Sequence, residues 1–412
     1  MTEYDLAVVG GGAAGMMAAL TAAEAGRSVI LFEKNEKLGK KLFITGKGRC
    51  NLTNACDLSD IFGHIVSNDR FMYSSLYSFS NEDVMAFFED RGLALKTERG
   101  SRVFPVSDHS SDVIRCLERC LRDAGCEIRL HTPVKELLIW DGVCEGVKLS
   151  EGREVRAGKV VVATGGLSYP STGSTGDGYR FAEDAGLRVT KLSPSLVPFN
   201  ADTEICRRLQ GLTLRNVSVS LRRGEKELYR GFGELLFTHF GVSGPLILTA
   251  SSEIKPDDIG AGAELVVDLK SALSVKETDE RLLREISQNP GKEYKNMLRE
   301  LLPAKLIPVA VDMTGIDPVK RAGSITKAER GRLLDFLKGM RIKVTSFRGY
   351  EEAVVTKGGV DVKELDPKTM ESKRVKGLFF AGEVIDVDAH TGGFNLQIAW
   401  ATGRAAGMAA GT

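Results

Sequence analysis

Short apolar runs on either side of a glycine-rich turn open the chain. Residues 6–9 are Leu, Ala, Val and Val, residues 10–15 read GGGAAG, and an alanine-rich segment extends to residue 25 before a second apolar run at 28–32. Four consecutive apolar residues fit a short parallel strand that is buried on both faces, and the alanine-rich segment favours a helix that Gly26 can end. The pattern therefore predicts strand, turn, helix and strand, which together make one βαβ unit.

More helices and strands follow up to residue 166. Helical periodicity covers residues 69–91, and a second helix is predicted at 111–124. Short apolar pieces at 137–140 and 143–149 flank an Asp-Gly pair, which predicts two paired strands of a β-meander. The apolar run that ends at residue 166 begins at Lys159 and predicts a buried strand that returns to the first sheet.

The pattern changes from about residue 193 to residue 347. Short alternating segments at 217–221 and 228–232 are typical of antiparallel strands, whereas 277–302 and 326–340 are charged and helical in period. We interpret this stretch as an insertion with a β-barrel-like part that carries a few helices. Its interior should not belong to the sheet that the N-terminus begins.

The last stretch of the chain returns to the earlier pattern, with a short apolar strand at 375–383 and a helix at 394–409 that is rich in small residues. The predicted fold class is therefore α/β, a Rossmann-type nucleotide-binding domain built from both chain ends and interrupted by a β-barrel-like domain that carries helices. The predicted domain ranges are 1–193 with 348–412, and 194–347 with a helical part at about 274–340.

The glycine turn carries the first functional prediction. Gly10 allows the tight turn, Gly12 lets the backbone approach a pyrophosphate, and Gly15 lets the helix pack close to the strand. Ala13 and Ala14 begin the helix, whose unpaired N–H groups and positive dipole end attract phosphates. These residues are therefore predicted to bind a dinucleotide.

An acidic residue ends the βαβ unit. Glu33 follows Gly10 by 23 positions, close to the spacing of about 20 expected for an acid that binds a ribose 2′-hydroxyl. Such an acid favours an adenosine ribose without a 2′-phosphate. The glycine fingerprint alone does not distinguish FAD from NAD.

Residues 34–54, KNEKLGKKLFITGKGRCNLTN, have no amphipathic period and predict a loop. Lysines and an arginine there suit phosphate, and its threonines and asparagines can hydrogen-bond a polar ring edge. The alternative is a solvated basic loop. The cofactor-binding residues predicted in this loop are Lys34, Lys41, Gly48, Arg49, Cys50 and Asn51. The neighbouring Arg49 could lower the pKa of Cys50 and make it reactive, although a structural thiol is the preferred interpretation.

Further glycines follow the later strands of the predicted sheet. The strand that begins at Lys159 leads into a loop at 167–179, rich in Ser, Thr and Gly, which can cover the cofactor. Two glycines precede the last helix and expose its N-terminus as a second anion site, unless they form only a turn before a packed helix. The predicted cofactor-binding residues in these stretches are Thr164, Gly165, Gly166, Gly382, Glu383, Asp386, Gly392, Gly393, Phe394 and Asn395.

Composition narrows the class of protein only a little further. The 412 residues are 42% hydrophobic and 27% charged, with a net charge of +1, so an ordinary globular protein without a nucleic-acid partner is predicted. The N-terminal segment carries acids and is interrupted by glycines, so we expect neither a signal peptide nor a membrane span, and a cytoplasmic location. Seven cysteines without a CxxC pair favour reduced thiols, and no metal site is predicted.

Longer motifs make the sequence resemble a known family. They are GGGAAG at 10–15, GKGRCNLTN at 46–54, ATGGLSYPSTGSTGDGY at 163–179, FTHFGVSGP at 237–245, VTKGGV at 355–360 and LFFAGEVIDVDAHTGGFNLQIAWATGRAAG at 378–407. The chain resembles the BaiN/YhiN-type flavoproteins, which are related in fold to the glutathione-reductase class. The resemblance implies one FAD per chain, held by both chain ends, with the inserted domain over the flavin. Members include a reductase of 3-oxo-Δ4,6 bile-acid intermediates and an aminoacetone oxidase that forms hydrogen peroxide.

The resemblance leads to a functional prediction with two alternatives. We expect NADH or NADPH to drive reduction of a conjugated C=C bond in a 3-oxo steroid or bile-acid-like enone. No second GxGxxG unit with its acid is visible, so the nicotinamide must reach the flavin by another route. The alternatives are an oxidase of a small amine such as aminoacetone, and a non-enzymatic flavin-binding or RNA-associated role, which the near-neutral charge disfavours.

Three residues are candidates for the proton donor or for the partner of the substrate carbonyl. His239 lies in a polar segment between a predicted strand and a helix, where a general acid and a structural histidine are equally consistent with the pattern. His390 stands where the family resemblance leads us to expect a glycine, close to the expected flavin. Tyr169 lies in the predicted cover loop. The substrate is expected to be a small molecule.

Overall fold

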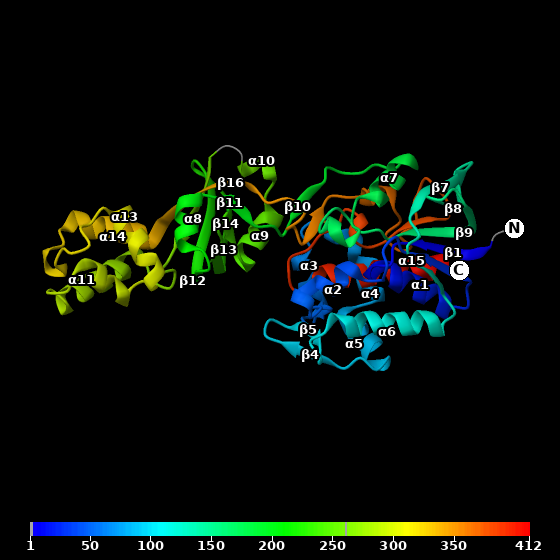
Figure 1. The fold of residues 1–412 in the computed structure, drawn as a ribbon, viewed down its shortest axis with the longest axis horizontal. Coiled ribbons are helices and arrows are strands. Elements are labelled where there is room, and N and C mark those ends of the chain that lie inside the picture. The colour runs from blue at the N-terminus through cyan, green and yellow to red at the C-terminus, as the bar shows by residue number, and fades with distance from the viewer. Residues whose placement is uncertain (1–2, 260–261) are drawn as a thin grey trace. The chain divides into compact units, whose positions relative to one another are not determined.

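The computed structural model describes residues 3–259 and 262–412. The chain forms two compact units, one of residues 1–195 with 350–412 and the other of residues 196–349 (Figure 1). Each unit has its own hydrophobic core. Within the described ranges, no helix is long and apolar enough to cross a membrane.

The first unit is built on a seven-stranded sheet in which β6, β2, β1, β9 and β18 pair in parallel, whereas β7 and β8 pair antiparallel. The sheet has the order β6-β2-β1-β9-β8-β7, and β18 also pairs with β9. The strands are β1 (Tyr4–Val9), β2 (Val29–Phe32), β6 (Glu127–Arg129), β7 (Val134–Trp140), β8 (Val143–Leu149), β9 (Glu154–Val162) and β18 (Leu378–Phe380). The first part of β9 pairs antiparallel with β8 and its last part runs parallel to β1, so the predicted meander joins the nucleotide sheet directly. The predicted α/β fold class is confirmed.

Two helices from opposite chain ends pack against each other on this sheet. They are α1 (Ala13–Glu24) and α15 (Phe394–Ala410). A Cβ atom on Gly403 would lie 2.4 Å from the carbonyl oxygen of Ala14, and one on Gly407 would lie 2.4 Å from that of Ala18. Only glycine permits this backbone approach, which explains the small-residue composition of the last helix.

The remaining elements of the first unit are short. The helices are α2 (Lys40–Ile44), α3 (Leu58–His64), α4 (Tyr73–Ser78), α5 (Asn81–Asp90), α6 (Ser110–Asp123) and α7 (Asp177–Asp184). The 3-10 turns are η1 (Thr45–Gly48), η2 (Asp69–Met72), η3 (Pro170–Thr172), η7 (Val362–Glu364) and η8 (Gly382–Val384). Two small antiparallel sheets are formed by β3 (Thr53–Asn54), β5 (Arg102–Pro105) and β4 (Leu95–Glu98), and by β10 (Ser193–Ser195) and β17 (Val355–Lys357).

Two predictions about these short elements need correction. The predicted loop at 34–54 contains the helix α2, which is too short to show a period and buries only Leu42. The predicted helix at 69–91 is divided into η2, α4 and α5. The division arises because Ser80 caps α5, with its hydroxyl bound to the Asp83 N–H and the Asp83 carboxylate bound to the Ser80 N–H.

The second unit contains a closed barrel and a helical part. The barrel order is β11-β14-β13-β12-β15-β16. Its strands are β11 (Phe199–Ala201), β12 (Thr213–Arg223), β13 (Lys226–Phe237), β14 (Gly241–Ser243), β15 (Ala263–Asp268) and β16 (Met340–Phe347). Its helices are α8 (Thr203–Leu209), α9 (Pro245–Glu253), α10 (Pro256–Ile259), α11 (Val275–Gln288), α12 (Tyr294–Met297), α13 (Ile307–Thr314) and α14 (Lys327–Gly339), with 3-10 turns η4 (Leu298–Glu300), η5 (Ala304–Leu306) and η6 (Ala322–Ser324).

Local sequence explains the helix boundaries in this helical part. Capping boxes at Ser274 with Glu277 and at Thr326 with Glu329 begin α11 and α14. The predicted helix at 277–302 breaks after α11, where Pro290 and Gly291 follow the C-cap residue Asn289.

Candidate cofactor site

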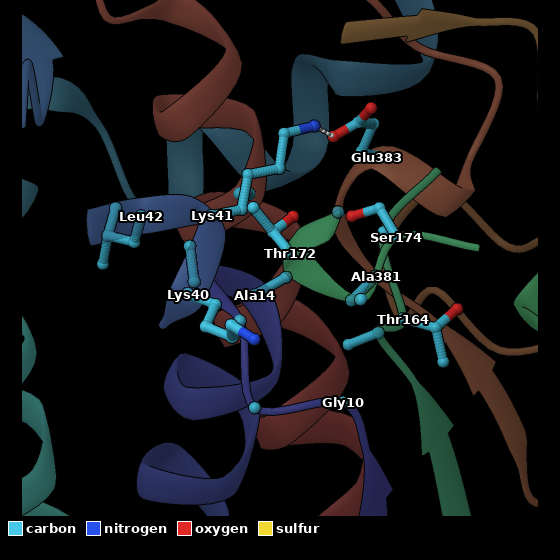
Figure 2. Close-up of a pocket in the computed structure, with 18 of the residues that line it drawn as sticks. Gly10, Ala14, Lys40, Lys41, Leu42, Thr164, Thr172, Ser174, Ala381 and Glu383 are labelled. Atoms are coloured by element: carbon cyan, nitrogen blue, oxygen red, sulfur yellow. Dashed lines mark hydrogen bonds and ion pairs between the residues drawn. The ribbon is translucent and has the colours of Figure 1, made fainter. Parts of the chain in front are cut away.

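A large pocket lies at the carboxyl ends of β1, β9 and β18, within the first unit (Figure 2). It encloses about 1320 Å³ of space between the protein atoms, part of it open to solvent. The carboxyl edge of a parallel sheet is where doubly wound folds bind their ligands. Residues that follow all three strands line it, among them Gly10, Ala163 and Ala381.

The glycine turn forms one wall of the pocket. Gly10 has a φ of +108°, and a Cβ on it would lie 2.5 Å from the carbonyl oxygen of Ala163. A Cβ on Gly15 would lie 1.9 Å from the carbonyl oxygen of Gly10, so this residue lies behind the wall and sets the distance between helix and strand. Gly12 is the N-cap residue of α1, no side chain caps that helix, and the space where its Cβ would stand is open. The backbone of Gly12, Ala13 and Ala14 is thus accessible to a phosphate group at a helix N-terminus.

Glu33 is fixed at the end of β2 beside this turn. Its Oε2 accepts a hydrogen bond of 2.8 Å from the Gly11 N–H, and its Oε1 accepts bonds from the backbone and side-chain amides of Asn35 at 2.8 and 2.7 Å. The carboxylate lines the pocket and is buried. Because each carboxylate oxygen has two lone pairs, the group can still accept ribose hydroxyls, and its predicted role stays a prediction.

Three lysines line the pocket in ion pairs, and the Lys40 ammonium lies 3.3 Å from Glu36. The Lys34 ammonium lies 2.6 Å from Asp177, and the Lys41 ammonium lies 2.6 Å from Glu383 and 2.5 Å from the Ser168 hydroxyl. Figure 2 shows Lys41 and Glu383 meeting across the pocket from α2 and η8. The Ser168 hydroxyl also donates to Glu383 Oε1, as does the Thr356 N–H. This network holds one cation and one anion at fixed positions in the pocket wall.

We expect Lys41→Met to weaken FAD binding about tenfold. Glu383 would keep two of its donors, so the wall should stay in place while the pocket loses a positive charge. The loss is modest because exposed or half-exposed pairs contribute about 1 kcal/mol. Fluorescence titration of the apoprotein with FAD measures the change, and Lys47→Met, an exposed lysine of the same stretch outside the pocket, is the matched control. Equal affinity in both variants would contradict the expectation.

The structure places Gly48, Arg49, Cys50 and Asn51 away from the pocket. The Arg49 guanidinium pairs with Glu98 and Asp108, each at 2.5 Å, and lies over the Phe104 ring. Because these carboxylates already balance its charge, a phosphate role for Arg49 loses support. Asn51 accepts a hydrogen bond from the Val103 N–H. The Cys50 side chain is fully buried and burial raises its pKa, so the structure gives no support to activation by Arg49 and favours a structural thiol.

The cofactor-binding residues predicted after β9 and around the start of α15 divide into two groups. Among the described residues, those predicted here that line the pocket are Thr164, Gly165, Gly382, Glu383 and Asn395. Those that lie outside the lining are Gly166, Asp386, Gly392, Gly393 and Phe394. Gly393 instead packs on the backbone, since a Cβ there would lie 2.3 Å from the carbonyl oxygen of Thr53. Asp386 is half-buried, and burial raises its pKa.

Several lining residues were missed by the sequence patterns. Thr132 and Val134 follow β6 and reach the same edge as β1, and Leu396, Ile398 and Ala399 come from α15. The parallel pairing of β6 with β2 is the signal that could have identified the first two, because the carboxyl ends of parallel strands meet at one edge. The three α15 residues are ordinary apolar side chains and carry no such signal.

The three catalytic candidates lie in different settings. Tyr169 is half-buried with a left-handed φ of 52°, and burial followed by the charge of Glu352 raises its pKa. His390 places its Nδ1 atom 3.4 Å from Nδ1 of His64, whose pKa is lowered by burial and then by His390. His239 belongs to the second unit, where it is exposed and its ring meets Phe240 edge-on. Their catalytic roles stay predictions.

A Rossmann-type sheet with a glycine turn, a terminal acid and a second helix N-terminus from the far chain end is typical of the FAD-binding domains of flavoprotein oxidoreductases. The family model described as HI0933-like protein Rossmann domain matches residues 4–409, and the chain belongs to this family of FAD-dependent oxidoreductases. The resemblance to the BaiN/YhiN-type flavoproteins is thereby confirmed.

Three relatives are similar over nearly their whole lengths. The ribosomal RNA dihydrouridine synthase of Haemophilus influenzae is 31% identical, covering 99% of both chains, and that of Escherichia coli is 31% identical, covering 98% of this chain and 96% of the relative. The 3-dehydro-bile acid delta(4,6)-reductase of Clostridium scindens is 31% identical, covering 98% of both.

Among solved structures, the 3-ketosteroid delta1-dehydrogenase of Sterolibacterium denitrificans matches with a TM-score of 0.56 and 13% identity, covering 99% of both chains. At that identity the match shows a shared fold alone.

The residues of the pocket fit FAD. Two helices, α1 and α15, begin at glycines without a side-chain cap, and both reach the pocket with their first turns. The Thr164 hydroxyl is buried there without a hydrogen-bond partner in the described part of the chain, so a bound group can satisfy it. The turn at Gly12 would hold the pyrophosphate and Glu33 the ribose, and the bound flavin would supply hydride chemistry.

Proposed function

We propose that this protein is an FAD-dependent reductase that uses NADH or NADPH to saturate a C=C bond conjugated with a carbonyl group. The observation that carries the proposal is the near-complete alignment with three relatives whose names share that chemistry. Dihydrouridine is uridine with its C5–C6 double bond reduced, and that bond is conjugated with the C4 carbonyl. A 3-dehydro bile acid with delta(4,6) unsaturation is likewise a conjugated ketone.

A uracil base in RNA is the substrate that we favour. Two of the three full-length relatives carry RNA-directed names. The net charge of +1 also conceals an uneven distribution, since residues 196–349 contain 25 Lys and Arg against 20 Asp and Glu, a net charge of +5. A positive unit favours polyanion binding. The expectation that the protein binds no nucleic acid was based on the net charge of the whole chain. The positive net charge of residues 196–349 weakens that argument.

A 3-oxo steroid or bile-acid-like enone is the second candidate substrate. It is supported by the bile-acid reductase relative, which covers 98% of both chains at the same identity as the RNA-directed relatives. The two substrates differ in size and charge, but the bond that is reduced has the same electronic character. One reaction class therefore accounts for both.

The chain's own residues have separate tasks in such a reduction. A hydride adds to the carbon β to the carbonyl and a proton to the α-carbon, so a donor must stand near the second carbon. Tyr169, His390 and His239 are the proposed donors. The ion pair of Lys41 and Glu383 places one positive and one negative charge beside the bound cofactor.

Anaerobic single-turnover mixing tests the proposal. Holoenzyme bleached with NADH or NADPH is mixed with an unmodified ribosomal RNA transcript or with a 3-oxo-Δ4 steroid, and flavin absorbance is followed. We expect reoxidation with the RNA and formation of dihydrouridine. Reoxidation by the steroid alone would select the second substrate, and no reoxidation by either would refute the reductase proposal. Peroxide formation from aminoacetone in air, without enone reduction, would favour the oxidase alternative.

A further inference from the structure

Three aromatic rings from two short helices of the first unit form a parallel stack. Phe62 of α3 lies 4.4 Å from Tyr73 of α4, with 19° between the ring planes. Tyr77 lies one helical turn further along α4, 6.2 Å from Tyr73 and 5.9 Å from Phe62, and its ring is within 8° of parallel to that of Tyr73. We call Phe62, Tyr73 and Tyr77 the aromatic platform.

The platform is open on its tyrosine side. Tyr77 is 64% exposed and Tyr73 is 45% exposed, whereas Phe62 is half-buried beneath them. Large aromatic side chains usually bury most of their surface, whereas these two neighbouring tyrosines, with nearly parallel rings, keep much of theirs in contact with water. Burial of those faces by another planar group would remove this apolar surface from water.

The platform adjoins the end of the cofactor pocket where α15 begins. Two residues after Phe62, the His64 ring stacks on Phe394 at 4.2 Å, and Phe394 is the first residue of α15. Its neighbours Asn395 and Leu396 line the pocket, and Asn395 binds the backbone of Ala389 through its side-chain amide. The α4 helix itself packs against α15. The platform and this end of the pocket therefore belong to the same unit and are joined through α15.

We propose that the aromatic platform stacks an unpaired base of an RNA strand whose target uridine enters the pocket. This inference rests on the proposed function and on its RNA substrate. A base inside a helix is inaccessible to a flavin in a pocket, so the target nucleotide has to be single-stranded or turned out of its stack. The exposed tyrosine rings replace the stacking that a neighbouring base loses at that point.

Stacking on this surface is independent of charge. The platform rings carry no cation, and Asp60 lies between Leu58 and Phe62 on α3, so the platform contributes little to phosphate binding. RNA affinity that falls with salt must come from lysines and arginines elsewhere in the chain. Loss of a platform ring should therefore lower the affinity by the same factor at every salt concentration.

Fluorescence anisotropy with a labelled single-stranded, uridine-containing RNA oligonucleotide and the holoenzyme tests the platform. We expect Tyr73→Ala and Tyr77→Ala each to weaken binding on the order of ten- to a hundredfold, with an unchanged slope of log affinity against log salt. Tyr73→Phe and Tyr77→Phe keep the rings and should bind like the parent protein. Trp140→Ala is the matched control, because Trp140 is 77% exposed on β7 of the same unit and outside the platform.

Several outcomes would overturn the platform. They are wild-type affinity in both alanine variants, equal losses in the phenylalanine and alanine variants, a reduced salt slope, or a parent protein that does not bind RNA. A dimer of the parent that Tyr77→Ala converts to a monomer would assign the surface to a second copy of the chain instead. Stacking that passes these tests in a protein that reduces no uridine would refute the proposed function alone. Uridine reduction with unaltered RNA affinity in the variants would refute the platform alone.

Discussion

Gly12→Ala should leave a folded protein that no longer retains FAD. Gly12 has φ −84° and ψ −170°, which alanine adopts readily, and no atom lies within 4 Å of the Cβ position. The new methyl group would therefore cost the apoprotein little, but it would stand in the open space before the N-terminus of α1. A phosphate held away from those N–H groups loses charge-assisted hydrogen bonds worth about 1.5–3 kcal/mol each. We expect the FAD affinity to fall on the order of a hundredfold or more.

Titration of the apoprotein with FAD measures this loss, and chemical denaturation of the apoprotein confirms the intact fold. Gly331→Ala is the neutral control, since Gly331 lies inside α14 with no atom within 4 Å of its Cβ position. That change should stabilise the helix by about 0.5–1 kcal/mol. Gly15→Ala is the opposite control, because its Cβ would meet the Gly10 carbonyl oxygen and should disrupt the turn itself. Full FAD occupancy in Gly12→Ala would show that the phosphates bind elsewhere.

The sequence patterns pointed to those residues of the pocket lining that depend on backbone conformation. The turn at Gly10 and Gly12 and the acid at Glu33 were identified because a close backbone approach and a fixed strand spacing leave a sequence pattern. The end of β9 was identified for the same reason, from the glycines that follow it, and the two glycines before α15 pointed to its first turn although they lie outside the lining themselves. These features are local, and short stretches of sequence determine them.

The predicted site residues that lie outside the pocket lining are held there by contacts between distant segments. In the sequence, Arg49 has the character of a phosphate ligand. In the fold, β4 and the turn after β5 place Glu98 and Asp108 against it, although these residues are 49 and 59 positions away along the chain. The burial that raises the pKa of Cys50 is likewise a property of the folded core. The aromatic platform escaped notice because Phe62 and Tyr73 belong to different helices and no sequence period joins them. The sequence of a single segment does not show which distant residues will contact it in the fold.

Trp400→Ala should be the most destabilising single change in the first unit. The side chain is fully buried in the middle of α15, its Nε1–H donates a 3.0 Å hydrogen bond to the Leu52 carbonyl, and its ring meets Phe88 edge-on at 5.5 Å. It therefore ties the last helix to the stretch that precedes β3 and to α5. Truncation of a buried tryptophan leaves a large cavity and costs about 3–5 kcal/mol.

Trp400→Phe separates the hydrogen bond from the packing. Phenylalanine fills most of the volume but leaves the buried Leu52 carbonyl without this donor, which costs about 1–3 kcal/mol. The protein contains only two tryptophans, Trp140 and Trp400, and both belong to the first unit, so Trp140 fluorescence still reports the unfolding of that unit in either variant. Because α15 also presents Asn395 and Leu396 to the pocket, loss of stability should be accompanied by weaker FAD binding. A loss below about 1 kcal/mol in Trp400→Ala would mean that the surrounding helices close the cavity and that this contact does not hold the two chain ends together.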